Sequence, residues 1–433
     1  MSSRHAEAVA LVFVWLAGSG LQAQPLPSEA EYKHLGAATC ATSVCHGKVT
    51  PDENSNVLLN EYRTWSSDDY HSDAYNVLRS DESRRMVEIL GLGNATTERI
   101  CLDCHADNIP AARRGEKFQI SDGVSCEACH GGAERWIESH AEEGATHQDN
   151  LALGMYPTDK PEARARLCLS CHVGTEQRFA GHDIMAAGHP RMSFELETFS
   201  VNQPAHYRID EDYVERKGDI GSVNMWVTGM LLKAERQLDL LRSDLFSGHG
   251  LFPELAFFDC HACHHPMNDR RMHATPVTSG LPPGAVRLDD SSFQMLLAIG
   301  SALDSGRTET LRERTRNLHL STTRGREPLR GAAAELGAAL DDLRRLAADR
   351  DYSEQEMREI RKLLLERAGD GQYGDFTSAE QAFLAVETLT IELGESQALD
   401  SSLDAWFDTL ASEHDFNPAG YATAARRVSA DVR

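Results

Sequence analysis

The stretch CLDCH, residues 101–105, decides the interpretation of this chain, because two cysteines separated by two residues are followed directly by a histidine. The same pattern returns as CEACH at 126–130, CLSCH at 168–172 and CHACH at 260–264. Two intervening residues hold the thiols at the spacing of the two vinyl groups of haem, and the histidine that follows can then reach the iron. The four stretches therefore predict four covalently attached haem c groups.

A fifth site is predicted in TCATSVCHGK, residues 39–48, although Cys40 and Cys45 enclose four residues rather than two. The stretch ends in the same C-H-G as residues 129–131, and Cys40 is the only cysteine left to partner Cys45. A longer, bulged loop can still present both sulfurs to the vinyl groups. We interpret C-x4-C-H as a haem site; the alternative is a haem held by one thioether at Cys45, with Cys40 idle.

The prediction is therefore about five haem c groups. The predicted attachment residues are Cys40, Cys45, Cys101, Cys104, Cys126, Cys129, Cys168, Cys171, Cys260 and Cys263. The predicted proximal iron ligands are His46, His105, His130, His172 and His264. Zinc is a weaker explanation, because tetrahedral zinc gives no reason for a histidine after every second cysteine. Adjacent C-x-x-C cysteines also make poor structural disulfides.

Histidines outside the motifs are predicted to fill the sixth coordination position of each iron. Seventeen of the nineteen histidines precede residue 274, the part of the chain that contains all the cysteines. The predicted distal ligands are His71, His140, His182, His189 and His206. His147 is the closest competitor of His182, and the reserves are His34, His249, His261, His265 and His273. Imidazole on both faces implies low-spin, low-potential haems; methionines such as Met155, Met185 and Met192 are the alternative ligands.

The first 23 residues predict export. They combine Arg4, a short apolar run and small residues that lead to Ala23, which is typical of a secretory signal peptide and too short for a membrane span. We expect a periplasmic or otherwise exported protein without a membrane span in the mature chain. The net charge of −24 argues against nucleic acid, and it indicates either a surface that only keeps the protein in solution or a basic redox partner protein, with a membrane-bound, quinol-linked protein as one option. The sequence leaves the oligomeric state open.

The chain divides by composition. Residues 24–272 have little sustained periodicity and are predicted to form a pentahaem cytochrome c domain that is held together by its cofactors. Residues 273–286 read as a linker, because they are rich in Pro, Gly, Ser and Thr. Residues 287–433 predict an all-helical domain of five to seven helices whose role is unknown. The predicted fold class is mainly α: a haem-packed helix-and-loop multihaem cytochrome domain, followed by an all-helical C-terminal domain.

Several helices are predicted in detail. Residues 326–350 should form one long helix, and two pairs with capping-box spacing, Ser353 with Glu356 and Thr377 with Glu380, should open two more. Residues 222–246 should form a helix that covers the cysteine region with an apolar stripe. The residues of that stripe are Trp226, Met230, Ala234, Leu238 and Leu241.

The order of these stretches resembles a known family. C-A-T-S-V-C-H-G, W-x5-H, C-L-D-C-H-A, G-V-S-C-E-A-C-H-G-G, G-H-P-R-M-S-F-E-L and F-D-C-H-A-C-H-H together resemble the multihaem c-type cytochromes of the cytochrome c-554 type, over roughly residues 33–270. The resemblance implies an exported electron carrier with haems packed in close pairs and with His71 and His140 as distal ligands. The family's named member is a tetrahaem carrier that serves hydroxylamine oxidation. This chain differs in its fifth motif and its additional helical domain.

The predicted function is electron transfer between redox partners through about five mostly bis-His haems, with no catalytic residue. The alternative is a multihaem oxidoreductase that acts on a small nitrogen or sulfur compound at a five-coordinate haem. Tyr70, Tyr75 and Tyr207 would then be candidates for acid–base work. A third possibility, a structural link in a larger redox assembly, rests on the helical C-terminal part.

Overall fold

The computed structural model describes residues 24–52, 55, 57–247, 253–265, 274–282 and 284–432. The predicted signal peptide and two reserve histidines, His249 and His273, lie outside the described residues. The protein is mainly helical, with 59% helix and no strand among the described residues, so the predicted fold class is confirmed. Within the same residues, none of the helices is both long and apolar enough to cross a lipid bilayer.

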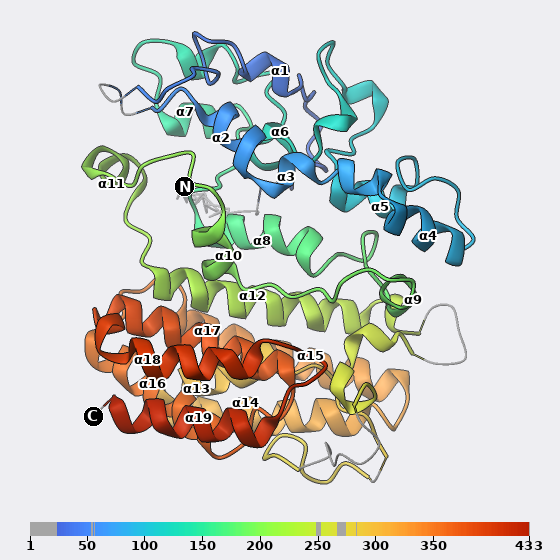
Figure 1. Cartoon of the computed structure of the whole chain (residues 1–433), viewed down its shortest axis with the longest axis vertical. Coiled ribbons are helices and arrows are strands. Elements are labelled where there is room, and N and C mark those ends of the chain that lie inside the picture. Colours follow the sequence, from blue (N-terminus) through green and yellow to red (C-terminus); the bar gives the residue numbers. More distant parts are fainter. Residues whose placement is uncertain are drawn as a thin grey trace, which may run out of the picture.

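The N-terminal part consists of short helices joined by long loops (Figure 1). Its α-helices are α1 (Ala37–Cys40), α2 (Glu61–Asp68), α3 (Tyr70–Asp73), α4 (Asp81–Ile89), α5 (Arg99–His105), α6 (Cys126–His130), α7 (His147–Ala152), α8 (Pro161–His172), α9 (His182–Ala186), α10 (Leu196–Asn202) and α11 (Glu211–Lys217). Its 3-10 helices are η1 (Asn76–Arg79), η2 (Ala111–Arg113), η3 (Ile120–Asp122), η4 (Ser139–Ala141), η5 (Leu245–Ser247), η6 (Leu255–Phe257) and η7 (Cys260–Ala262).

Among the described residues, two small apolar clusters support most of these short helices, while η5 and η6 contribute Phe246 and Phe257 to a larger core shared with the C-terminal helices. One cluster contains Tyr75, Leu78, Val87, Ala95, Leu102 and Ala106. The other contains Ala165, Leu169, Phe194, Leu196, Met225 and Leu232. Such clusters bury little apolar area for the length of chain that they order, as the weak periodicity of this region predicts.

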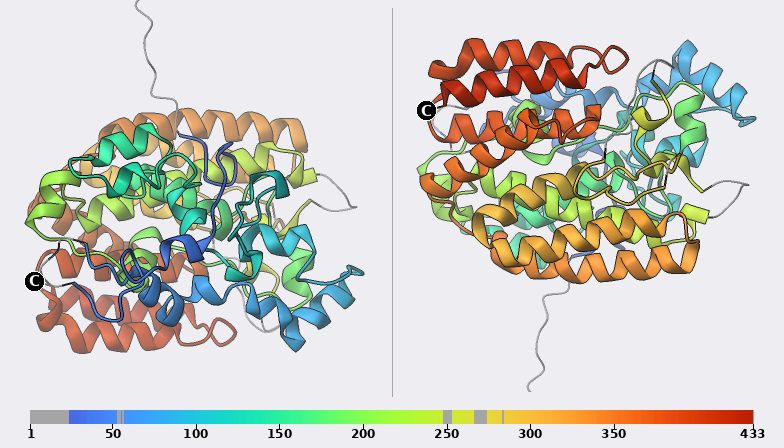
Figure 2. Two further views of the ribbon diagram at one scale, coloured as in Figure 1. Left: turned by 90° about the horizontal axis from the view of Figure 1, so that it is seen from above. Right: turned by 90° about the horizontal axis from the view of Figure 1, so that it is seen from below.

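The C-terminal part is a bundle of longer helices around a large apolar core. Its helices are α13 (Ser291–Leu303), α14 (Ser305–Ser321), α15 (Arg326–Ala347), α16 (Glu354–Gly369), α17 (Phe376–Glu392), α18 (Ser396–Phe407), η8 (Asp408–Leu410) and α19 (Pro418–Asp431). Helix α15 confirms the predicted long helix. Figure 2 shows these helices, in orange and red, as a layer behind the N-terminal segments in one view and in front of them in the other.

One of the two predicted capping boxes is correct and the other is wrong. Ser353 accepts a hydrogen bond from the backbone N–H of Glu356 at the start of α16, and the Glu356 side chain accepts one in return. Helix α17 instead begins one residue before Thr377, because the Asp375 side chain accepts from the N–H of Ser378 at 2.7 Å and takes the cap. An aspartate is at least as good an N-cap as a threonine, so the nearby competitor fixes the start of the helix.

Helix α12 (Ser222–Arg242) lies between the two parts (Figure 1). The predicted stripe is fully buried, but its predicted partner is wrong, because all five stripe residues belong to the core of the C-terminal bundle. A different face, with Met225 and Leu232, packs against α8 and α10. The helical period of 3.6 residues shows which face of a helix is apolar, but it does not show which segment covers that face. Helix α12 is covered on two sides.

The apolar core runs across the predicted boundary between the domains. It joins α12, Phe246 and Phe257 on one side of the predicted linker to the C-terminal helices on the other. Within the linker, Val277 is 1% exposed and belongs to the same core. The apolar core is therefore continuous across the predicted linker. The division into residues 24–272, 273–286 and 287–433 stays a prediction that rests on composition alone.

Candidate functional site

Five pairs of histidines dominate the N-terminal part. We number the sites by their motifs: site 1 (residues 40–46), site 2 (101–105), site 3 (126–130), site 4 (168–172) and site 5 (260–264). Each motif histidine lies opposite one of the five predicted distal histidines. The ring-centre distances are 6.2 Å for His46–His140, 6.3 Å for His105–His189, 6.2 Å for His130–His206, 6.2 Å for His71–His172 and 6.2 Å for His182–His264.

These distances fit two imidazoles on opposite sides of one metal ion. An imidazole nitrogen binds a transition metal at about 2.0–2.1 Å and lies about 1.15 Å from its own ring centre, which puts two ring centres roughly 6.3–6.5 Å apart. The angle between the paired rings varies from 14° to 88° while the distance stays constant. Other aromatic pairs of the described chain range from 4.6 to 6.1 Å. A constant gap at variable angle indicates a spacer rather than direct ring contact.

The outer ring nitrogens of several paired histidines have hydrogen-bond acceptors. The Nδ1 acceptors are Glu61 Oε2 for His46 at 2.8 Å, Asp69 Oδ1 for His71 at 2.9 Å, the Ala74 carbonyl for His105 at 2.9 Å, the Ile137 carbonyl for His140 at 2.7 Å and the Pro190 carbonyl for His189 at 2.8 Å. A histidine that donates from Nδ1 keeps the Nε2 lone pair for a metal. This donor set fits haem iron.

Burial keeps some of the paired rings neutral. Burial, and then the neighbouring His206, lower the pKa of His130 to about 3, and burial, followed by His71, lowers the pKa of His172 to about 4. Only the neutral imidazole can bind a metal, so this electrostatic setting favours ligation at neutral pH.

Two paired rings have a carboxylate behind them instead of a carbonyl. The hydrogen bond to Glu61 raises the pKa of His46, and the hydrogen bond to Asp69 raises the pKa of His71, both against the effect of burial. Burial also disfavours ionised Asp69, but hydrogen bonds from His71 and Gln203 outweigh it and lower the pKa of Asp69 to about 2. A carboxylate acceptor makes an imidazole a stronger donor to the metal.

Short structural elements place the distal histidines. His71 lies in α3, whose N-cap Asp69 both starts the helix and holds the ring. His140 lies in η4, one turn after Trp136, and its ring meets the indole edge-on at 5.4 Å. His182 opens α9, and His189 follows the end of the same helix.

The C-x4-C-H loop of site 1 keeps a backbone contact of the regular motif. The N–H of His46 donates to the carbonyl of Cys40 at 3.1 Å, just as the N–H of His264 donates to the carbonyl of Cys260 at 2.7 Å. Two turn hydrogen bonds, from Cys45 and Gly47 to the carbonyl of Thr42, absorb the extra residues. Cys40 therefore holds the position of a first motif cysteine relative to His46.

The remaining histidines of this region have other partners. His34 is buried, and its Nδ1 lies 2.7 Å from Asp107. His147 Nε2 lies 3.0 Å from Asp159, and His261 Nε2 lies 3.0 Å from the carbonyl of Glu413. His265 follows His264 directly and is not one of the ten paired rings.

Sequence reasoning missed the carboxylates behind the paired rings. The contact between Asp69 and His71 could have been predicted from the sequence, because a helix-capping aspartate two positions before a histidine can reach its ring. The contact between Glu61 and His46 could not have been predicted, since Glu61 comes fifteen residues after His46.

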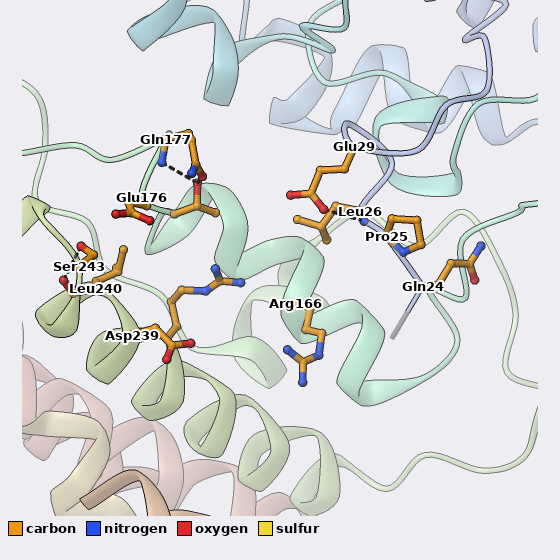
Figure 3. Close-up of a pocket in the computed structure, with 12 residues that line it drawn as sticks. Gln24, Pro25, Leu26, Glu29, Arg166, Glu176, Gln177, Asp239, Leu240 and Ser243 are labelled. Atoms are coloured by element: carbon orange, nitrogen blue, oxygen red, sulfur yellow. Dashed lines mark hydrogen bonds between the residues drawn. The ribbon is translucent and has the colours of Figure 1, made fainter. Parts of the chain in front are cut away.

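Two cavities lie away from the paired histidines. One, of about 380 Å³, opens between the segment that starts at Gln24, helix α8 and helix α12, with Arg166 and Asp239 among its lining residues (Figure 3). The other, of about 530 Å³, is lined by Arg113 and Arg178 among others. None of the ten paired histidines lines either cavity.

Within the described ranges, no group of three or more His, Cys, Asp and Glu side chains is arranged to hold a metal ion by itself. The same residues contain no disulfide, and Cys45 and Cys263 are the two exposed thiols.

Comparison with known proteins adds a family match. Residues 39–131 match the family described as cytochrome c554 and c-prime. This segment contains the motifs of sites 1, 2 and 3 together with His71, and it is shorter than the resemblance over 33–270. No curated protein and no solved structure matches the chain. Together with the motifs, this match supports a c-type cytochrome that resembles the cytochrome c554 and c-prime family, with covalently bound haem c and a role in electron transfer.

Proposed function

We propose that this protein is an exported, periplasmic electron carrier with five haem c groups, each bound between two histidines. The five histidine pairs with their constant ring separation carry this proposal. The ten cysteines of the five motifs attach the groups, with Cys40 and Cys45 serving site 1. Because each motif histidine faces a second histidine, two histidines would hold each iron and no position would be left open for a substrate, which suits a carrier rather than an enzyme.

Haem iron, once bound, supplies a one-electron couple. The residues of this chain hold and tune it. Paired imidazoles favour the ferric state and therefore low potentials. The carboxylates of Glu61 and Asp69 make His46 at site 1 and His71 at site 4 stronger electron donors to iron. We therefore expect the reduction potentials of these two sites to be lower than those of sites whose histidines donate to backbone carbonyls.

The contacts between motifs suggest an order for the sites. Glu127 of site 3 accepts from the N–H groups of Leu35 and Gly36, both at 2.7 Å, directly before α1 of site 1. The N–H of Val124, two residues before the motif of site 3, donates to the carbonyl of His71, the distal histidine of site 4, at 3.0 Å. These contacts support the partial order 1–3–4.

Two further contacts extend the order to the remaining sites. Cys171 Sγ of site 4 lies 3.9 Å from the carbonyl oxygen of Asp103, inside the motif of site 2. Helix α9 and the turn after it carry His182 of site 5 and His189 of site 2. We propose that electrons pass along the sites in the order 1–3–4–2–5 or the reverse.

The second candidate function is a small-molecule oxidoreductase, and one observation favours it. Tyr207 packs against the paired histidine of site 3, with ring centres of Tyr207 and His206 5.6 Å apart. Arg164 Nη1 lies 3.4 Å from the Tyr207 hydroxyl. If His206 released its iron, the Tyr207 hydroxyl could serve as a proton donor to a substrate, and the Arg164 guanidinium could bind an anionic substrate. Of the other two tyrosines, Tyr70 is 91% exposed and Tyr75 is buried in an apolar cluster.

The haem count tests the proposal. The intact mass of the purified protein should correspond to the polypeptide plus five haem groups. Cys40→Ala should keep five haems, one of them now held through a single thioether at Cys45, or lose the haem of site 1. A mass with four haems or fewer in the unaltered protein would contradict the proposal. An unchanged number of thioether bonds in Cys40→Ala would show that Cys40 is not attached.

A further inference from the structure

We propose that the C-terminal helices are a positioning scaffold, which fixes site 2 and site 5 relative to each other and so sets the electron-transfer step between them. Arg191 and His261 are its main positioning residues. The proposal rests on the proposed function, because this step exists only if both sites hold haem. One electron moves from one iron to the other, so that one iron is oxidised as the other is reduced and no bond changes.

Arg191 fastens the distal side of site 2 to the bundle. It follows His189 by two residues, and its Nε lies 3.0 Å from Glu413 Oε2 while its Nη2 lies 3.2 Å from Glu380 Oε2. The guanidinium also lies over the ring of Phe376, 5.2 Å from its centre. The Arg191 side chain is only 18% exposed. Such a charge-assisted, doubly bonded and stacked arginine holds its segment in one geometry.

His261 fastens the motif of site 5 to the same place. It is 4% exposed, and its Nε2 lies 3.0 Å from the Glu413 carbonyl, to which it donates. Its ring centre lies 6.1 Å from those of both Phe376 and Phe416. The corresponding positions of the other regular motifs hold Leu102, Glu127 and Leu169. The histidine that distinguishes CHACH is therefore placed as an anchor, and its reserve role as an axial ligand is corrected.

A half-buried ion pair holds the other side of the same motif. Asp259, directly before Cys260, lies 3.2 Å from the Nε of Arg287, and the same guanidinium pairs with Asp375, the N-cap of α17. Two backbone hydrogen bonds of 3.0 Å, between Asp259 and Arg287 and between Asp289 and Phe257, join these segments. Site 5 is thus tied to the start of α17 as well as to Glu413.

The distal side of site 5 is tied to this frame as well. The N–H of His182 donates to Glu254 Oε1 at 2.8 Å, in the segment that leads into the motif of site 5. Since α9 and its turn join His182 to His189, Arg191 and Glu254 hold the two ends of one short segment. Both sites therefore share one framework, whose fixed points are α17 and Glu413. Electron transfer rates fall steeply with distance, so this framework sets how fast the step runs.

The test uses the full haem-loaded protein with Arg191→Ala, His261→Ala and the double variant. Arg314→Ala is the matched control, because it breaks an ion pair with Glu335 between α14 and α15 without touching a motif segment. His261→Gln is the rescue variant, since its amide N–H can still donate to the Glu413 carbonyl. Glu380→Gln, which keeps the size of the side chain and removes the charge, replaces Arg191→Ala if that variant does not fold.

Haem counts by intact mass come first, followed by a redox titration and stopped-flow measurement of electron redistribution. We expect five haems, a shift in two of the five potentials and slower redistribution in the alanine variants, with wild-type behaviour in Arg314→Ala and recovery in His261→Gln. Loss of the site 5 haem alone in His261→Ala also supports the scaffold. Five haems with all potentials and rates unchanged in the double variant overturn it. Fewer than five haems in the unaltered protein overturn the proposed function itself, and the scaffold with it.

Discussion

The two parts of this molecule are both helical, but they are stabilised in different ways. The C-terminal helices bury a continuous apolar core, in which Ile360, Leu364 and Trp406 are 0% exposed. The N-terminal part has two small clusters, and its ten paired histidines face each other across constant gaps. Helix formation alone therefore does not show where stability comes from: one part is held by side-chain packing, and we infer that the other is held by its cofactors.

Removal of haem should reveal this difference between the two parts with the largest effect. Protein produced without haem attachment should lose ordered structure in the N-terminal part, because its gaps would be unfilled, while α12 and α13–α19 stay helical. Limited proteolysis with peptide mapping should show cleavage throughout residues 24–220 and protection from 284 onward. Equal protection of both parts would contradict the comparison. The haem-loaded protein, treated in parallel, is the control.

A cavity in the C-terminal core should produce the next largest effect. Leu364→Ala removes a fully buried side chain from α16 and should cost about 2–5 kcal/mol of unfolding free energy. Ile391→Ala, at a position in α17 that is 59% exposed, is the control and should change stability by less than about 0.5 kcal/mol. Urea titrations followed by far-UV circular dichroism measure both. Similar losses for the two variants would argue against a packed core.

Acid should weaken an ion pair of the N-terminal part by a smaller amount. Burial disfavours ionised Asp159, but the hydrogen bond from His147 and the nearby Lys160 outweigh it and lower its pKa to about 2 from 3.8. A depressed carboxyl pKa stabilises the fold above about pH 4, and this contribution is lost as the pH falls from about 4 to 2.

Asp159→Asn should therefore cost roughly 1–2 kcal/mol at neutral pH and flatten the decline between pH 4 and 2. Urea midpoints of the haem absorbance, recorded against pH, measure both effects. Asp212→Asn, which removes an exposed partner of Arg216, is the control and should change little. A decline between pH 4 and 2 as steep in Asp159→Asn as in the unaltered protein would refute the assignment.

The smallest predicted effect distinguishes the haem sites from each other. Glu61→Gln weakens the acceptor behind His46, so the potential of site 1 should rise. A tenfold change in the preference for ferric iron corresponds to about 59 mV for one electron. Spectroelectrochemistry should show one of five components moving by tens of millivolts. Asp69→Asn should move a different component, and movement of the same component by both variants would contradict the two separate sites.

Part of this architecture could be predicted from sequence, for identifiable reasons. The motif cysteines and histidines stand in fixed local spacing, and the excess of histidine in the N-terminal part pointed to the five histidines that face them. Which histidine faces which motif could not be predicted, since His46 meets His140 and His182 meets His264 through the folding of distant segments.

The errors of prediction also have physical causes. The stripe of α12 was visible from its period, but a period does not identify the partner. Thr377 had the right spacing for a cap, but Asp375 was the stronger competitor two residues earlier. His261 was treated as a spare ligand because nothing local showed that the backbone carbonyl of Glu413, far along the chain, would accept a hydrogen bond from its ring.

Low-temperature EPR of the oxidised protein tests the central claim most directly, because it reports the axial ligands of every ferric haem. If all five sites hold iron between two histidines, the spectrum will contain only low-spin ferric signals that integrate to five haems per chain and do not change with nitrite or hydroxylamine. A high-spin signal that shifts when either compound is added would contradict the account and favour the oxidoreductase, with site 3 beside Tyr207 as the first place to look.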